Sequence, residues 1–131
     1  MRLVLDANVV LSAALRDGFV RHALATTDAD LFAPAFLQTE LDKHLPAIAR
    51  RAGVHVADAR AALAALLADV VWIAPHAIQT KWDEAHKALG TIDEKDVPYL
   101  ACALAVGADA IWSYDKDFDA QTLVRRVTQP A

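Results

Sequence analysis

The sequence predicts one α/β domain built on a parallel β-sheet, and three observations lead to this fold class. Short apolar runs bounded by polar or turn residues alternate with longer Ala- and Leu-rich stretches, in which apolar residues recur every three to four positions. This alternation is typical of βαβ units. The first four short runs are apolar at their centres, as expected for parallel strands covered by helices on both faces. Because 131 residues with 56% hydrophobic content suffice for one core but hardly for two, we expect one domain over residues 1–131.

Five short apolar runs are candidate strands. Each is bounded by polar or turn residues, which is where strands of a buried sheet begin and end. The candidates are Leu3–Leu5, Asp30–Ala33, Val70–Ala74, Ala110–Ser113 and Val124–Thr128.

The stretches between these runs are candidate helices. They are Val9–Arg16, Gly18–Ala25, Ala35–Arg51, Val56–Ala68, Ala77–Leu89 and Asp96–Val106. Pro34 and Gly53 flank the third helix and suit its start and its stop, so the third and fourth helices form a hairpin around Gly53. Pro98 has no N–H to donate and is harmless only in a first turn, which places the start of the sixth helix near Lys95 or Asp96.

Composition excludes several classes of protein. Seventeen acidic residues against thirteen Lys and Arg give a net charge of −4, so any nucleic-acid contact must be local. Cys102 is the only cysteine and lies in an apolar run, so it forms no internal disulfide and completes no thiolate metal site. Asp6 and Asn8 interrupt what would otherwise be a secretory segment, and no apolar stretch reaches the roughly 18 residues of a membrane span. We expect a soluble, cytoplasmic protein.

Acidic residues follow two of the predicted strands. Asp6 comes directly after the first strand and Asp115 follows the fourth, in both cases where the chain turns from sheet to helix. Open α/β sheets bind ligands beyond the carboxyl ends of their strands, at the point where the strand order reverses. If the first and fourth strands are neighbours, the two carboxylates face one another.

Two further acids extend this cluster. Asp96 lies at the start of the sixth helix, and Glu40 lies one turn into the third helix. Four converging carboxylates repel one another unless a cation is present. Without a cysteine set or zinc-like histidine spacing, such oxygen-rich ligation suits Mg²⁺ or Mn²⁺. Magnesium also keeps water molecules, one of which can act as a nucleophile.

Four segments in order resemble the PIN-domain family, and the likeness covers almost the whole chain. The segments are LDANV (5–9), PAFLQTELDKH (34–44), DEKDVPYLACA (93–103) and WSYDKDF (112–118). The resemblance implies a three-layer α/β/α fold with a central parallel sheet of five strands in the order 3-2-1-4-5.

The resemblance also implies roles for individual residues. The metal-binding and catalytic acids carry over to Asp6, Glu40, Asp96 and Asp115, with Asp117 as an outer metal ligand. The residues expected beside the substrate are Asn8, Ser113 and Tyr114. Ser113 stands where the family usually has threonine, which exchanges one hydroxyl for another.

Many bacterial PIN domains of this size are similar to VapC toxins, which cut RNA and are blocked by a small antitoxin. The resemblance therefore implies a Mg²⁺- or Mn²⁺-dependent endoribonuclease that hydrolyses RNA phosphodiester bonds. It further implies that the protein is the toxin of a type II toxin–antitoxin pair, with RNA and a small antitoxin as its partners.

Other interpretations stay open at this stage. Taken singly, Asp6, Asp96 and Asp115 suit turns and helix caps, and Glu40 suits a solvated helix face. Asp93 and its neighbour Glu94 are open to two interpretations, an outer shell of the metal site or a solvated loop, and we favour the loop. The protein as a whole could instead be an RNA-processing nuclease that is not a toxin, or a non-catalytic PIN-like or receiver-like interaction domain. An aspartyl phosphatase is a weaker alternative, because its second acid is replaced by Asn8.

The helical hairpin of residues 35–68 predicts self-association. Its second helix has more apolar residues than one core-facing stripe requires. We therefore expect a homodimer. Arg50, Arg51 and Arg60 lie on the same hairpin, where they either guide phosphates or serve the helices alone, and the sequence leaves both readings open.

Overall fold

The computed structural model of the protein describes residues 1–15 and 17–130. Within these ranges, five parallel strands form one sheet in the order β3-β2-β1-β4-β5. The strands are β1 Arg2–Leu5, β2 Asp30–Pro34, β3 Val71–Ile73, β4 Ala110–Trp112 and β5 Arg125–Val127. The predicted α/β class, the strand order and the central place of the first and fourth strands are confirmed.

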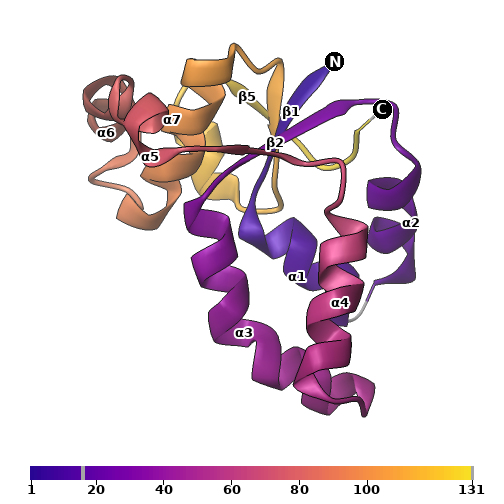
Figure 1. Ribbon diagram of the computed structural model, residues 1–131. Coiled ribbons are helices and arrows are strands. Elements are labelled where there is room, and N and C mark those ends of the chain that lie inside the picture. The colour runs from indigo at the N-terminus through magenta and orange to yellow at the C-terminus, as the bar shows by residue number, and fades with distance from the viewer. Residues whose placement is uncertain (16, 131) are drawn as a thin grey trace.

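Helices cover the sheet on both sides. They are α1 Ala7–Leu15, α2 Gly18–Thr26, α3 Phe36–Ala52, α4 Val56–Leu66, α5 Pro75–Gln79, α6 Trp82–Leu89 and α7 Val97–Val106. Figure 1 shows α5, α6 and α7 gathered on one side of the strands and α1 to α4 on the other. The hairpin of α3 and α4 extends beyond the sheet, while α7 packs directly on β1, β2 and β4.

The central strand of the sheet is deeply buried from solvent. Leu3, Val4 and Leu5 of β1 are fully buried, because β1 has a strand on each side and helices above and below. Leu5 pairs with Trp112 of β4, and the backbone N–H of Asp6 donates to the carbonyl of Trp112 at 3.1 Å. The residues after β1 and after β4 therefore emerge side by side at the carboxyl edge of the sheet.

Local sequence signals explain where the helices begin and end. Asp17 caps α2 by accepting hydrogen bonds from the backbone N–H groups of Phe19 and Val20. Gly53 ends α3 in the left-handed conformation, with φ of 70°. Pro98 lies in the first turn of α7, as its missing N–H requires. The end of the first predicted helix at Arg16 lies outside the described residues.

The prediction of one helix over Ala77–Leu89 is wrong, because the structure has two helices, α5 and α6. A continuous helix would give the carbonyl of Ala77 to the backbone N–H of Lys81. Instead the hydroxyl of Thr80 donates a hydrogen bond to that carbonyl at 2.6 Å. The backbone N–H of Lys81 donates to the carbonyl of Ile78 at 3.0 Å. Competition from the threonine side chain thus breaks the helix at this point.

Cys102 is fully buried in α7, and burial raises the pKa of its thiol to about 12. This agrees with the place of Cys102 in an apolar run of the sequence, which indicates a buried, unreactive thiol. Across residues 1–15 and 17–130, none of the helices combines the length and the apolar character that a membrane crossing requires.

Candidate metal centre

Asp6 lies at the carboxyl end of β1 and is 5% exposed. Its Oδ1 accepts a hydrogen bond from the backbone N–H of Ala7 at 2.8 Å, and its Oδ2 accepts one from the hydroxyl of Ser113 at 2.6 Å. Burial outweighs these two bonds and raises the pKa of Asp6 to about 6. A cation close to Asp6 would remove this conflict between burial and charge.

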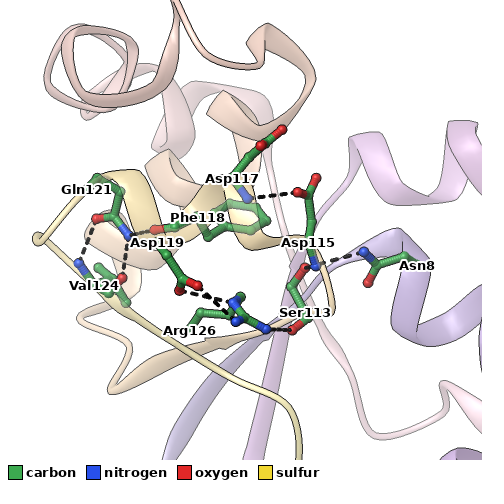
Figure 2. A network of polar contacts seen from close by, with 9 residues as sticks. All are labelled: Asn8, Ser113, Asp115, Asp117, Phe118, Asp119, Gln121, Val124 and Arg126. Carbon is green, nitrogen blue, oxygen red and sulfur yellow. Dashed lines mark hydrogen bonds and ion pairs between the residues drawn. The ribbon is translucent and has the colours of Figure 1, made fainter.

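Ser113 fastens the loop after β4 to the end of β1. It is fully buried, and its Oγ accepts a hydrogen bond from the backbone N–H of Asp115 at 2.9 Å. Asn8 supports the same loop, because its side-chain amide donates to Ser113 Oγ at 3.4 Å and its Oδ1 accepts from the N–H of Tyr114 at 3.3 Å. Figure 2 shows Asn8 reaching across to Ser113. The predicted contact of these side chains with substrate stays a prediction.

Asp96 precedes α7 and is 5% exposed. It makes no capping hydrogen bond, and its Oδ2 has no hydrogen-bond partner within the described ranges. Burial, followed by the neighbouring carboxylate of Asp115, raises the pKa of Asp96 to about 8. The side chain of Asp96 therefore does not cap α7, which was the alternative role that the sequence allows for it. A buried carboxylate oxygen without a partner is costly unless it is protonated or bound to a cation.

Asp96 is one of four carboxylates that lie close together. Asp93, Asp96, Asp115 and Asp117 can each offer one oxygen atom such that all four atoms lie within 4.8 Å of one another. Asp115 Oδ1 also accepts from the backbone N–H of Asp117 at 2.9 Å, which fixes the turn between the two (Figure 2). The charge of Asp115 raises the pKa of Asp117 above its usual value. The four acids therefore form a dense, negatively charged group.

Of the two interpretations that the sequence allows for Asp93, the structure supports a place beside the metal site and not the solvated loop that we favour from the sequence. The chain from Glu94 to Asp96 forms a 3-10 turn, and Asp93 caps it by accepting from the N–H of Lys95 at 3.0 Å. In a 3-10 turn, side chains three residues apart lie on the same side. The spacing of Asp93 and Asp96 would have indicated this grouping if the turn had been predicted.

Glu40 lies outside the group of four but close to it. Its Oε1 accepts a hydrogen bond from the hydroxyl of Tyr99 at 2.6 Å. Tyr99 is buried on α7 with its ring edge-on to Phe36, and burial followed by the Glu40 carboxylate raises its pKa far above the usual range. Glu40 and Asp115 both raise the pKa of Asp6, and Asp6 raises that of Asp96. The four acids predicted from the sequence therefore interact electrostatically.

The residues present fit a hard divalent cation. The donors are all carboxylate oxygens, and one of the four residues, Asp96, has a buried oxygen without a partner among the described residues. Mg²⁺ and Mn²⁺ prefer such ligands. The ion pairs found among the described residues are Arg60–Asp42 and Arg126–Asp119, so neither compensates the acidic group. Arg60 on α4 thus pairs with Asp42 on α3, which favours a role in the helical hairpin over one in guiding phosphates.

The fold and site define a class of protein: a parallel α/β protein with carboxylates gathered beyond the carboxyl edge of its sheet. The family model of the PIN domain matches residues 4–129, and the chain belongs to the PIN-domain family. A sequence comparison with curated proteins gives no match.

Solved structures with this fold include chains of two bacterial complexes. One is the crystal structure of VapBC2 from Rickettsia felis bound to a DNA fragment from their promoter, with a TM-score of 0.75, 13% identity, and coverage of 97% of this chain and 98% of the other. Another is the 2.2 Å structure of VapBC-1 from nontypeable Haemophilus influenzae, with a TM-score of 0.69, 17% identity and 97% coverage of each chain. At such identities the likeness concerns the fold.

Proposed function

We propose that the protein is a metal-dependent ribonuclease that hydrolyses phosphodiester bonds in RNA. The observation that carries the proposal is the buried Asp96 carboxylate, whose Oδ2 has no partner within the described ranges and lies in a group of four acids. Membership of the PIN-domain family supports it. Carboxylates alone would repel a phosphodiester, so the substrate requires a cation between them.

The acidic residues have distinct tasks in this proposal. Asp96 and Asp115 would hold the cation, and Asp93, Asp117, Asp6 and Glu40 are the further acids of the site. Bound Mg²⁺ or Mn²⁺ would stabilise negative charge on the phosphate and lower the pKa of water. Ser113 and the Ala7 amide hold the carboxylate of Asp6 in a fixed orientation. Tyr99 does the same for the carboxylate of Glu40.

The RNA chain lies over the exposed rim of this site. Tyr114 follows β4 directly, beside Asp115, and is 38% exposed, so its ring is free to stack on an unpaired base. Asn8 lies under the same loop. With a net charge of −4, the protein has to rely on the cation and such local contacts rather than on a basic surface.

A fluorogenic RNA cleavage assay tests the reaction. The parent protein cleaves in Mn²⁺ or Mg²⁺ and not in chelator, and Asp6→Asn and Asp96→Asn each lower the rate by about 100-fold or more, because each removes a charge that holds the cation. Asp69→Asn is the matched control, since Asp69 is exposed and lies before β3, away from the carboxyl edge. A parent protein that cleaves no RNA would leave the non-catalytic interaction domain as the better reading.

We further propose that the protein is a toxin whose activity a small antitoxin blocks. The support is the likeness in fold to chains of two VapBC complexes. Expression in a bacterial host should arrest growth, and Asp96→Asn should relieve the arrest. Cleavage in the test tube without arrest of growth would instead favour an RNA-processing nuclease.

A homodimer built on the α3–α4 hairpin is the remaining part of the proposal. Val54 and Val56 at its tip are 45% and 42% exposed, and apolar side chains such as Leu41, Leu45 and Leu63 line an open groove of about 460 Å³ between the two helices and β3. Leu41, Leu45 and Leu63 are themselves buried, so the exposed apolar surface that supports an interface here is that of the two valines. Light scattering at micromolar concentration should give twice the mass of the chain, and a strict monomer would contradict the dimer.

A further inference from the structure

Arg126 connects three parts of the chain behind the acidic group. Its side chain is 15% exposed. Its Nε and Nη2 donate to Asp119 Oδ1 and Oδ2 at 3.0 and 2.9 Å, and its Nη1 donates to the carbonyl of Ser113 at 3.2 Å. Figure 2 shows the guanidinium between the two residues. One planar group thus joins β5, the end of β4, and the 3-10 turn Lys116–Ala120.

The two residues that Arg126 binds bracket the two acids of the loop. Asp115 and Asp117 both lie between Ser113 and Asp119 in the sequence. A guanidinium fork holds both partners in one fixed geometry, because its five N–H donors are coplanar. Binding the two ends of this short segment to one rigid group restricts the positions that Asp115 and Asp117 can take.

Gln121 fixes the far side of the same turn. It is buried, its Nε2 donates to the carbonyls of Phe118 and Val124 at 2.7 and 2.6 Å, and its Oε1 accepts from the N–H groups of Leu123 and Val124. Phe118, fully buried, anchors the middle of the turn. The backbone of the turn is therefore held from both sides, while the carboxylates of Asp115 and Asp117 lie close to those of Asp93 and Asp96.

We infer that Arg126 is a positioning residue of the metal centre. By binding Asp119 and the Ser113 carbonyl, it holds Asp115 and Asp117 at the spacing at which they bind a divalent cation. The inference rests on the metal site of the proposed function and adds the residue that sets its affinity. Partners that orient metal ligands in this way commonly account for a 10- to 100-fold difference in metal affinity.

Charge and position predict opposite effects when Arg126 is replaced. Arg126 lies near enough to Asp115 for their charges to interact. If Arg126 acted by charge alone, Arg126→Gln would make the site more negative and tighten cation binding. If it acts by position, the same change loosens the loop and weakens binding.

Titration calorimetry with Mn²⁺ on the full chain separates the two effects. We expect Arg126→Gln to raise the dissociation constant about 10-fold, and Arg126→Lys, which keeps the charge but loses the fork, to raise it as well. Arg125→Gln is the matched control, because Arg125 is exposed and its side chain leaves the opposite face of β5. It should bind Mn²⁺ as the parent does or slightly more tightly. Saturating Mn²⁺ should restore cleavage by Arg126→Gln.

Each outcome decides the inference. Arg126→Gln binding Mn²⁺ as tightly as Arg125→Gln would overturn it. If a thermal melt in chelator shows that Arg126→Gln does not fold, Arg126→Lys becomes the test. Mn²⁺ affinity of Arg126→Lys equal to that of the parent would overturn the inference, and weaker affinity would support it. A parent that binds no Mn²⁺ removes the metal site itself, and that failure appears in the parent's titration before any variant is compared.

Discussion

At the scale of single residues, Asp96 gives the sharpest prediction. Asp96→Asn keeps the shape of the side chain and removes a buried ionisable group from a crowded acidic group. In chelator the variant should therefore be as stable as the parent or more stable, and Mn²⁺ should raise its melting temperature far less. Thermal melts with and without Mn²⁺ measure both effects. A clear loss of stability in chelator would show that the charge of Asp96 serves the fold.

Tyr99 gives a second prediction at this scale. Tyr99→Phe removes only the hydroxyl that donates to Glu40 at 2.6 Å and keeps the ring beside Phe36. We expect a loss of about 1–2 kcal/mol in the free energy of unfolding and a fall in the RNA cleavage rate, since Glu40 loses its fixed orientation. Urea unfolding and the cleavage assay measure the two effects. An unchanged cleavage rate would show that Glu40 acts without Tyr99 or takes no part.

The sequence could predict those site residues that follow directly from strand ends. Asp6 and Asp115 each come after an apolar run, and parallel strands bring such residues to one edge. The sequence leaves the place of Asp93 open, because that place depends on a 3-10 turn rather than on a helix start. The network around Arg126 was missed because its partners meet only when β5 is placed beside β4. Tertiary contacts of this kind leave no periodic signal in the chain.

At the scale of elements, Gly53 tests how the α3–α4 hairpin is closed. Gly53 has φ of 70°, and nothing lies within 4 Å of where a Cβ would be placed. Gly53→Ala should therefore cost about 1 kcal/mol in the free energy of unfolding, through backbone strain alone. Gly18→Ala, within α2 at ordinary φ, is the control and should cost nothing or stabilise the helix. Urea unfolding compares the two, and equal stabilities would contradict the left-handed turn.

Helices and strands were predictable where one local signal dominates. The third helix, expected over Ala35–Arg51, is found at Phe36–Ala52, because Pro34 and Gly53 mark its two ends. The expected helix over Ala77–Leu89 failed because apolar spacing continues through Thr80, whereas the hydroxyl of Thr80 takes the carbonyl that the helix needs. Periodicity reports which face of a segment is buried and does not report competition for a backbone group.

At the scale of the whole molecule, the acidic group makes stability depend on pH. Folding raises the pKa of Asp6 to about 6 and that of Asp96 to about 8, from 3.8 in both cases. The folded protein therefore holds these protons more tightly than the unfolded chain. The resulting stability is fully present below pH 3.8 and is lost as the pH rises through 6 and then 8.

The stability of the metal-free protein relative to Asp96→Asn should accordingly fall as the pH rises from about 4 to about 8. Urea unfolding in chelator over this range measures the difference. Mn²⁺ should reverse the fall at the alkaline end, because the cation competes with protons for the same oxygens. A parent whose stability follows that of Asp96→Asn at every pH would show that the proton on Asp96 is bound no more tightly after folding.

The central claim is that Asp96 and Asp115 hold a divalent cation at the carboxyl edge of the sheet. Anomalous diffraction from a crystal of the parent grown with Mn²⁺ tests this most directly. We expect a Mn²⁺ peak bound by oxygens of both carboxylates at about 2.0–2.2 Å, and no such peak in crystals of Asp96→Asn. A fully ordered site without manganese, or manganese bound only elsewhere on the surface, would contradict it.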